Sequence, residues 1–150
     1  MALYHFSVRH VSRGKGQMVV ASAAYISGQR IFDSYYNKIH DYTSKSGVVF
    51  TEILTPEYVP ERLTDRETLW NEVEHVERNN KAQLAYSFDI ALQNELTLEE
   101  NIRLAKEFCQ EQFVARGMIV DLAVHEGKSD NEEEADNPHF HVLVPIRPFT

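Results

Sequence analysis

The sequence predicts one α+β domain with a mainly antiparallel five-stranded sheet and packed helices. Five short segments show the apolar patterns of strands, and three longer segments repeat apolar residues at helical spacing. The last two strand segments are joined by a polar loop that cannot hold a crossover helix, so we expect them to pair antiparallel. A chain of 150 residues without internal repeats or an interior linker fits a single core.

The first third of the chain is expected to form a strand, a helix and a loop. Residues 3–11 alternate apolar and polar side chains, which predicts a half-buried strand. Residues 18–30 are rich in small side chains and follow a basic glycine loop, so a helix can pack closely on the sheet there. Residues 33–46 are polar and aromatic without a clear period, which predicts a loop.

The middle of the chain predicts two strands that flank a helix. Residues 47–54 form a strand that stops before a proline. A helix over 64–79 can be capped by Thr64 together with Glu67. The apolar stripe of this helix is Leu69, Val73 and Val76. Residues 83–92 then return as a strand.

The last third predicts a long helix followed by two strands. Thr97 and Glu100 make a capping box at the start of the helix, and the helix ends near Gly117. Its inward residues are expected to be Leu98, Ile102, Ala105, Phe108 and Phe113. Residues 118–126 and 139–146 complete the sheet.

Composition is that of an ordinary soluble protein, with 43% hydrophobic and 25% charged residues. No segment approaches the ~18 to 20 apolar residues of a membrane span, and the N-terminus lacks a secretory signal. The single Cys109 cannot form an internal disulfide and is expected to be a core thiol. We therefore expect a cytoplasmic protein without a membrane segment.

The net charge of −8 neither supports nor excludes a nucleic-acid partner, because the charge is unevenly distributed. The first 50 residues carry six Lys or Arg against two Asp, whereas six acids fall between Glu126 and Asp136. A basic first third can still face a polyanion.

Three histidines near the end of the chain form the clearest candidate site. His139 and His141 leave the same face of their strand, and His125 ends the preceding strand. An antiparallel pair brings the end of one strand beside the start of the next. Three neutral imidazoles with no nearby Cys suit a divalent ion with open coordination positions. The alternative is an incidental pair of exposed histidines, which the third histidine makes less favourable.

The residues NPHFHVLV, with an upstream His in AVHEG, resemble the His-hydrophobe-His motif of the HUH endonucleases. More narrowly, the chain is similar to the N-terminal nuclease domain of the MobA/MobL (MobQ-type) conjugative relaxases. The opening YHFSVRHVSRGKGQMVVASAAYISGQR independently resembles that family's first strand, glycine loop and tyrosine-bearing helix. The resemblance covers residues 3–147 and implies an HUH-relaxase-like sheet with the metal-binding histidines on its last two strands.

This resemblance implies an enzyme that nicks one DNA strand at a transfer origin and forms a covalent 5′-phosphotyrosyl intermediate. Tyr25 matches the position of the family's nucleophile. The implied cofactor is a divalent ion, Mn²⁺ or Mg²⁺, with other transition metals as alternatives. From the residues alone the loop tyrosines Tyr35, Tyr36 and Tyr42 are rivals, since a helical Tyr is often just packed.

The resemblance leaves one catalytic position open and suggests DNA contacts near the opening strand. Ser87 stands where the family commonly has a Glu. Asp89 shares its strand face and could accept a proton or support a ligand His, unless it only lies on a solvated face. The expected phosphate-binding residues are Arg9, Arg13, Lys15 and Arg30.

Three other functions remain open at this point. A rolling-circle replication initiator shares the metal motif, although such enzymes tend to carry the tyrosine after the histidines. A three-histidine metal hydrolase or lyase would act on a small molecule with water as the nucleophile. A non-catalytic DNA-binding module would be indifferent to metal.

The implied partners are single-stranded transfer-origin DNA, accessory relaxosome proteins and a coupling protein. Residues 1–150 are expected to be a relaxase domain and an N-terminal fragment of a longer protein. The origin sequence and the oligomeric state are not predictable from these residues.

Overall fold

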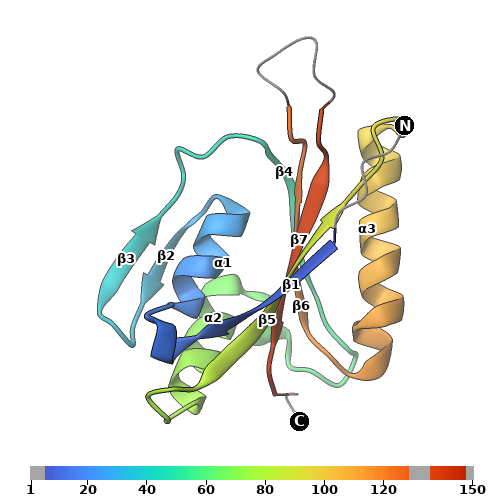
Figure 1. The fold of residues 1–150 in the computed structure, drawn as a ribbon. Helices are drawn as coiled ribbons and strands as arrows, with labels where there is room; N and C mark the ends of the chain where they lie inside the picture. The colour runs from blue at the N-terminus through green and yellow to red at the C-terminus, as the bar shows by residue number, and fades with distance from the viewer. Residues whose placement is uncertain (1–5, 129–135, 148–150) are drawn as a thin grey trace.

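The computed structural model describes residues 6–128 and 136–147 and contains a five-stranded antiparallel sheet with helices on both faces (Figure 1). The sheet order is β1-β5-β7-β6-β4. The strands of this sheet are β1 (Phe6–Ser12), β4 (Val48–Leu54), β5 (Gln83–Ala91), β6 (Val120–His125) and β7 (His139–Pro145). The predicted α+β class and the antiparallel pairing of the last two strands are confirmed.

Three helices cover the sheet, with α1 (Val19–Ser27) and α2 (Arg66–Val76) on one face and α3 (Leu98–Gln112) on the other (Figure 1). Each face has its own apolar core. Buried side chains under α1 and α2 include Val20, Ala23, Leu69, Trp70, Leu84 and Leu143. Those under α3 include Ala105, Cys109, Leu122, Val124, Phe140 and Val142. Consecutive residues of β7 thus point into different cores, and Cys109 is a core thiol as expected. Among the described residues, no helix is both long and apolar enough to cross a membrane.

Residues 6–128 and 136–147 also contain three short 3₁₀ turns. They are η1 (Arg13–Lys15), η2 (Glu61–Thr64) and η3 (Val114–Arg116). The third helix was expected to end near Gly117, but α3 ends at Gln112, and Gly117, with a φ of 90°, ends the separate turn η3. Most of the acidic loop between β6 and β7, and residues 3–5 of the expected first strand, lie outside the described residues.

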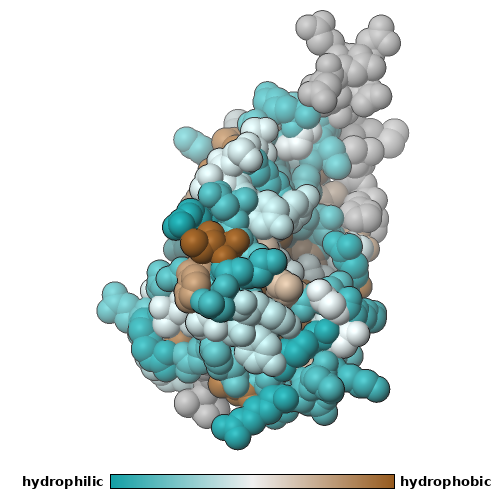
Figure 2. Space-filling view, turned by 90° about the vertical axis from the view of Figure 1, so that its left-hand side faces the viewer, coloured by the Kyte–Doolittle hydropathy of each residue, from teal (hydrophilic) through white to brown (hydrophobic). Residues whose placement is uncertain are grey.

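The expectation of a loop over 33–46 is wrong for its first part, which belongs to a hairpin of β2 (Arg30–Asp33) and β3 (Lys38–Asp41). The Asp33 carboxylate accepts the N–H groups of Tyr35 and Tyr36 and so fixes the turn. Asn37 adopts a positive φ of 52°. Two four-residue strands are too short to show an alternating pattern. Figure 2, which views the molecule from the side where this hairpin lies in Figure 1, shows a mostly hydrophilic surface with small hydrophobic areas.

All three helices end earlier than expected, α1 at Ser27, α2 at Val76 and α3 at Gln112, and a cap and two faces also differ from the predictions. The cap of α2 is Asp65, whose side chain accepts the Thr68 N–H, because Thr64 is taken up in the preceding 3₁₀ turn. Val76 is 56% exposed and Leu98 is 46% exposed, so neither packs inward. Both residues lie in a terminal turn of their helix, where the chain leaves the sheet. The capping box of Thr97 and Glu100 is confirmed.

A buried ionic cluster joins α2 to the sheet. The Arg66 guanidinium donates to both carboxylate oxygens of Asp121 at 2.8–3.0 Å, and Trp70 Nε1 donates to the same carboxylate at 2.8 Å. Asp121 is 0% exposed, so its charge depends on these donors. The cluster therefore fixes the position of α2 on β6.

Replacing Asp121 with Ala is expected to lower the free energy of unfolding by roughly 3 to 5 kcal/mol, because Arg66 would remain buried without its partner. Asp65→Ala removes only a surface helix cap and should cost about 1 kcal/mol. Urea denaturation of both variants measures the difference. Equal losses for the two variants would contradict the role of the cluster.

Candidate functional site

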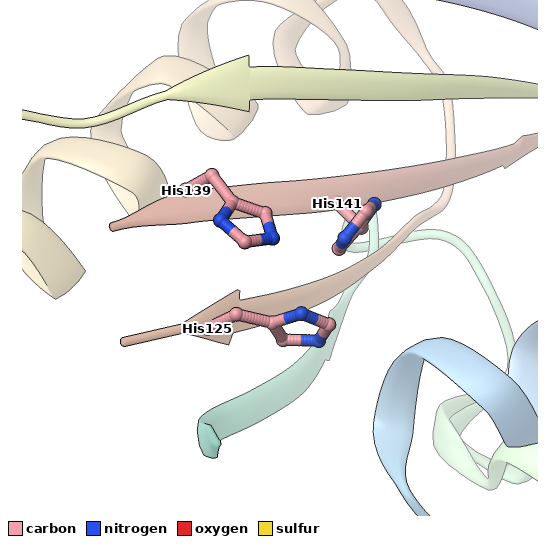
Figure 3. Close-up of side chains that lie close together, drawn as sticks. All are labelled: His125, His139 and His141. Atoms are coloured by element: carbon pink, nitrogen blue, oxygen red, sulfur yellow. The ribbon is translucent and has the colours of Figure 1, made fainter. Parts of the chain in front are cut away.

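The three predicted histidines converge on one point between β6 and β7 (Figure 3). His125 is paired with His139, and Ala123 with His141, so all three side chains leave the same sheet face. One ring nitrogen from each lies within 4.8 Å of the others, and the ring centroids are 4.5 to 5.1 Å apart. The predicted geometry of the cluster is confirmed.

Hydrogen bonds at the rear of two rings decide which nitrogen faces the centre. His125 Nε2 lies 2.8 Å from the Ile26 carbonyl oxygen, and His139 Nδ1 lies 2.8 Å from the Asn137 carbonyl oxygen. A carbonyl only accepts, so these nitrogens carry the protons when the rings are neutral. His125 is thus left with the Nδ1 lone pair and His139 with the Nε2 lone pair, which suits a metal ligand set supported from behind.

Burial favours the uncharged form of His125 and His141. It lowers the pKa of His125 below the ordinary value of 6.5 and lowers the pKa of His141 to about 4. Neighbouring positive charges add to both shifts. Neutral imidazoles at neutral pH are the form that binds metal, and no fourth His, Cys, Asp or Glu joins the cluster within the described part of the chain. The donor set therefore fits a divalent ion that keeps open positions for other ligands.

Tyr25 lies on the exposed side of α1, facing a pocket of about 310 Å³. The N-cap residue Met18 and, from α1, Ala21, Ser22, Tyr25 and Ile26 line this pocket, whereas Val19, Val20, Ala23 and Ala24 of the helix are buried away from it. Gly28, with a φ of 65°, ends the helix directly after this face. Tyr25 is 51% exposed and so is accessible to a substrate.

The floor of the same pocket is formed by Arg9, Ser87 and His141. They come from β1, β5 and β7, which are neighbours in the sheet, and all point to one face. The structure therefore brings the tyrosine helix and the histidine cluster to one pocket, a relation that no sequence spacing could establish.

The rival tyrosines occupy two different places. Tyr42 lines the pocket, and its ring meets that of Tyr25 edge-to-face with centroids 5.3 Å apart. Tyr35 and Tyr36 lie in the β2–β3 turn, where Tyr35 contacts the Arg13 guanidinium and the His75 ring. Neither of these two tyrosines lines the pocket.

Asp89 lies on the sheet face of the site, with Oδ1 4.0 Å from His141 Nδ1. Its register partner across the strands is His141 itself, while Ser87 lies opposite Arg9 and Leu143. Asp89 is thus placed beside a ring of the cluster, where a carboxylate can orient a histidine.

The four expected DNA-contacting residues are placed differently. Arg9 is exposed in the pocket, and Lys15 and Arg30 are exposed outside it, with Arg30 3.9 Å from Asp41. Arg13 is buried, and its guanidinium donates to the carbonyl groups of Glu74, Glu77 and Asn79. The expectation that Arg13 contacts DNA is therefore wrong, because its guanidinium is buried and both terminal nitrogens donate within the fold.

Lys45 is a residue of the site that sequence reasoning missed. It follows β3, and its Nζ lies 3.4 Å from the centre of the Tyr25 ring and donates to the Tyr25 carbonyl at 3.1 Å. A single Lys in a polar segment carries no signal in the sequence that distinguishes it from other surface lysines.

Comparison with known proteins gives relatives that cover nearly all of this chain. It is 36% identical over 160 residues to the conjugal transfer protein TraA of Agrobacterium fabrum, covering 100% of this chain and 14% of TraA. It is 33% identical to the mobilization protein MobL of Acidithiobacillus ferridurans, covering 97% of this chain and 38% of MobL. The chain thus spans less than half the length of these curated relatives.

A solved structure from work on the molecular basis of vancomycin resistance transfer in Staphylococcus aureus has the same fold. It aligns with a TM-score of 0.89 and 40% identity over 99% of this chain and 73% of the other. The sequence pattern of the MobA/MobL family matches residues 17–150, from the start of the Tyr25 helix to beyond the histidine strands. The chain therefore belongs to the MobA/MobL family, as its two end motifs predicted.

Proposed function

We propose that this chain is the nuclease domain of a DNA relaxase, which nicks one strand at a transfer origin through attack by Tyr25. One observation carries the proposal. Tyr25 and His141 line the same pocket, and His141 belongs to a three-histidine cluster suited to metal. A tyrosine beside a metal site is the arrangement that covalent phosphodiester chemistry needs.

In the proposed reaction, Tyr25 Oη forms a bond to phosphorus while the bond from phosphorus to the 3′ oxygen breaks. The phenol proton passes to Asp89 or to solvent, and the 3′ oxygen keeps the electron pair of the broken bond and takes up a proton. The products are a 5′-phosphotyrosyl ester and a free 3′-OH. The number of phosphoester bonds is unchanged, so reversal can rejoin a strand.

The three histidines would hold the ion, with Nδ1 of His125 and Nε2 of His139 as donors. A bound divalent ion polarises a non-bridging phosphate oxygen and orients the phosphate for in-line attack. We favour Mn²⁺ over Mg²⁺, because Mg²⁺ prefers oxygen ligands and imidazole nitrogen suits transition metals. Asp89, 4.0 Å from His141, would orient that ring.

Single-stranded DNA is the proposed substrate, as membership of the MobA/MobL family suggests, and its scissile phosphate would lie in the pocket of about 310 Å³. Arg9 on the pocket floor would contact a phosphate, and the Tyr42 ring could support an unstacked base. We also propose that the protein acts in the cytoplasm with accessory relaxosome proteins and a coupling protein.

The alternatives differ in the role of Tyr25. A small-molecule metal hydrolase uses water, so it would tolerate loss of the phenol, and a binding module would tolerate loss of the metal. A rolling-circle initiator would form the same adduct, but on a replication origin. The exposure of Tyr25 within the histidine pocket favours the tyrosine reactions over the first two alternatives.

Tyr25→Phe is expected to reduce the covalent protein–DNA adduct by at least roughly 1000-fold, because it removes the attacking oxygen. The protein is incubated with Mn²⁺ and labelled single-stranded origin oligonucleotides, and the products are separated on a denaturing gel. Tyr35→Phe, an exposed tyrosine in the hairpin turn, is the matched control and should match wild type. Cleavage that persists in Tyr25→Phe would move the nucleophile elsewhere.

Mn²⁺ is expected to stabilise the protein by about 2.7 kcal/mol at a concentration 100-fold above its Kd. His139→Ala should weaken Mn²⁺ binding by at least roughly 10- to 100-fold, since one of three ligands is lost. Calorimetric titration and thermal unfolding measure both effects. Equal Mn²⁺ binding by wild type and His139→Ala would exclude this site.

The stabilising contribution of His141 is expected to depend on pH in the metal-free protein. Its pKa is about 4 in the folded protein and 6.5 when unfolded, so the unfolded chain binds more protons between these values. The contribution is complete above pH 6.5 and is lost as the pH falls towards 4. Urea denaturation of wild type and His141→Gln with EDTA, from pH 4.5 to pH 7.5, should show a difference in stability that grows with pH. A constant difference would contradict the neutral state of this ring.

A further inference from the structure

Lys45 contacts the proposed nucleophile in two ways. Its ammonium donates a hydrogen bond of 3.1 Å to the Tyr25 carbonyl oxygen, and it lies 3.4 Å from the centre of the Tyr25 ring. The side chain is half-buried, in the segment that links β3 to β4. The Tyr42 ring meets the Tyr25 ring edge-to-face. The orientation of Tyr25 is therefore set by contacts from this one segment.

The positive charge of Lys45 acts on Tyr25 and on the nearby histidines. Among residues 6–128 and 136–147, no carboxylate forms an ion pair with Lys45. Asp41 lies near Arg30, and Asp89 lies near His141. The Lys45 ammonium contributes to the lowered pKa of both His125 and His141, and burial lowers the pKa of Lys45 itself. Partial burial also leaves the field of an ammonium less screened by water than at an open surface.

An ammonium over an aromatic face is attracted by the ring, and more strongly as that ring gains negative charge. The phenol of Tyr25 gains such charge when it gives up its proton, and keeps part of it until the bond from its oxygen to phosphorus is complete. Because the hydrogen bond to the Tyr25 backbone holds Nζ in place, the charge is already positioned before the reaction begins. Pre-positioned charge is the most effective form of electrostatic stabilisation in a site.

We propose that Lys45 is a positioning residue for the strand-transfer reaction, holding the Tyr25 ring and stabilising the negative charge that develops on its phenol. This inference rests on the proposed function. The competing explanation is that Lys45 merely ties its loop to α1, in which case only stability should depend on it.

The test measures single-turnover adduct formation with Mn²⁺ and a single-stranded origin oligonucleotide. Lys45→Met keeps the length of the side chain and removes its charge. We expect the maximal rate to fall about 10- to 30-fold, with little change in the DNA concentration that gives half-maximal rate. Lys45→Arg should recover most of the rate. Lys38→Met removes an exposed lysine of β3, the strand that precedes the Lys45 segment, and should react like wild type.

Chemical rescue separates charge from folding. Lys45→Cys should be slow until 2-bromoethylamine converts the thiol into a thioether analogue of lysine, which restores the ammonium. The native Cys109 is buried, and treated wild type controls for any other modification. Mn²⁺ binding and thermal unfolding of each variant report on the metal site and the fold.

The outcomes distinguish this inference from the proposed function. A Tyr25-dependent adduct in wild type with a Lys45→Met rate equal to wild type overturns only the role of Lys45. So does a slow Lys45→Met that neither Lys45→Arg nor the alkylated cysteine improves. Absence of any adduct with wild type overturns the proposed function, and this inference with it.

Discussion

The carbonyl groups at the C-terminal end of α1 are the constraint on which the site depends. The last turn of a helix leaves carbonyls without partners in the helix. Here the Ile26 carbonyl accepts from His125, and the Tyr25 carbonyl accepts from Lys45. One helix end therefore fixes the ring orientation of a metal-site histidine and the ammonium beside the tyrosine. A shift of α1 would disturb both together.

The central strands of the sheet position the three histidines and Asp89. β7 lies in the centre, between β5 and β6, so its histidines have a neighbouring strand on each side. His125 comes from β6, and Asp89 comes from β5. On the same side, the Arg66–Asp121–Trp70 cluster fixes α2 on β6, and α2 packs against α1. The position of the tyrosine helix thus follows from a buried ionic contact away from the pocket.

The electrostatics of the site depend on the charged groups around the pocket and not on the net charge of −8. Arg9 lines the pocket and Lys45 contacts the Tyr25 ring, whereas burial favours the uncharged form of His141, and Asp89 lies beside His141. Arg13, which the sequence suggested as a phosphate contact, is instead used within the fold because three backbone carbonyls lie around its guanidinium. Whether a cation is available to a ligand is decided by the carbonyls near it, which composition does not reveal.

The sequence by itself determined the main strands, the three helices, the capping box at Thr97 and the shared face of His139 and His141, because these follow from periods of 2.0 and 3.6 residues. The sequence also placed His125 near these two histidines, because antiparallel pairing brings the end of one strand beside the start of the next. Only the tertiary structure decided the β2–β3 hairpin, the burial of Arg13, the placing of Tyr25 and His141 in one pocket and the contact of Lys45 with Tyr25. These depend on the packing of α1 against the sheet, a contact between distant segments that no local pattern encodes.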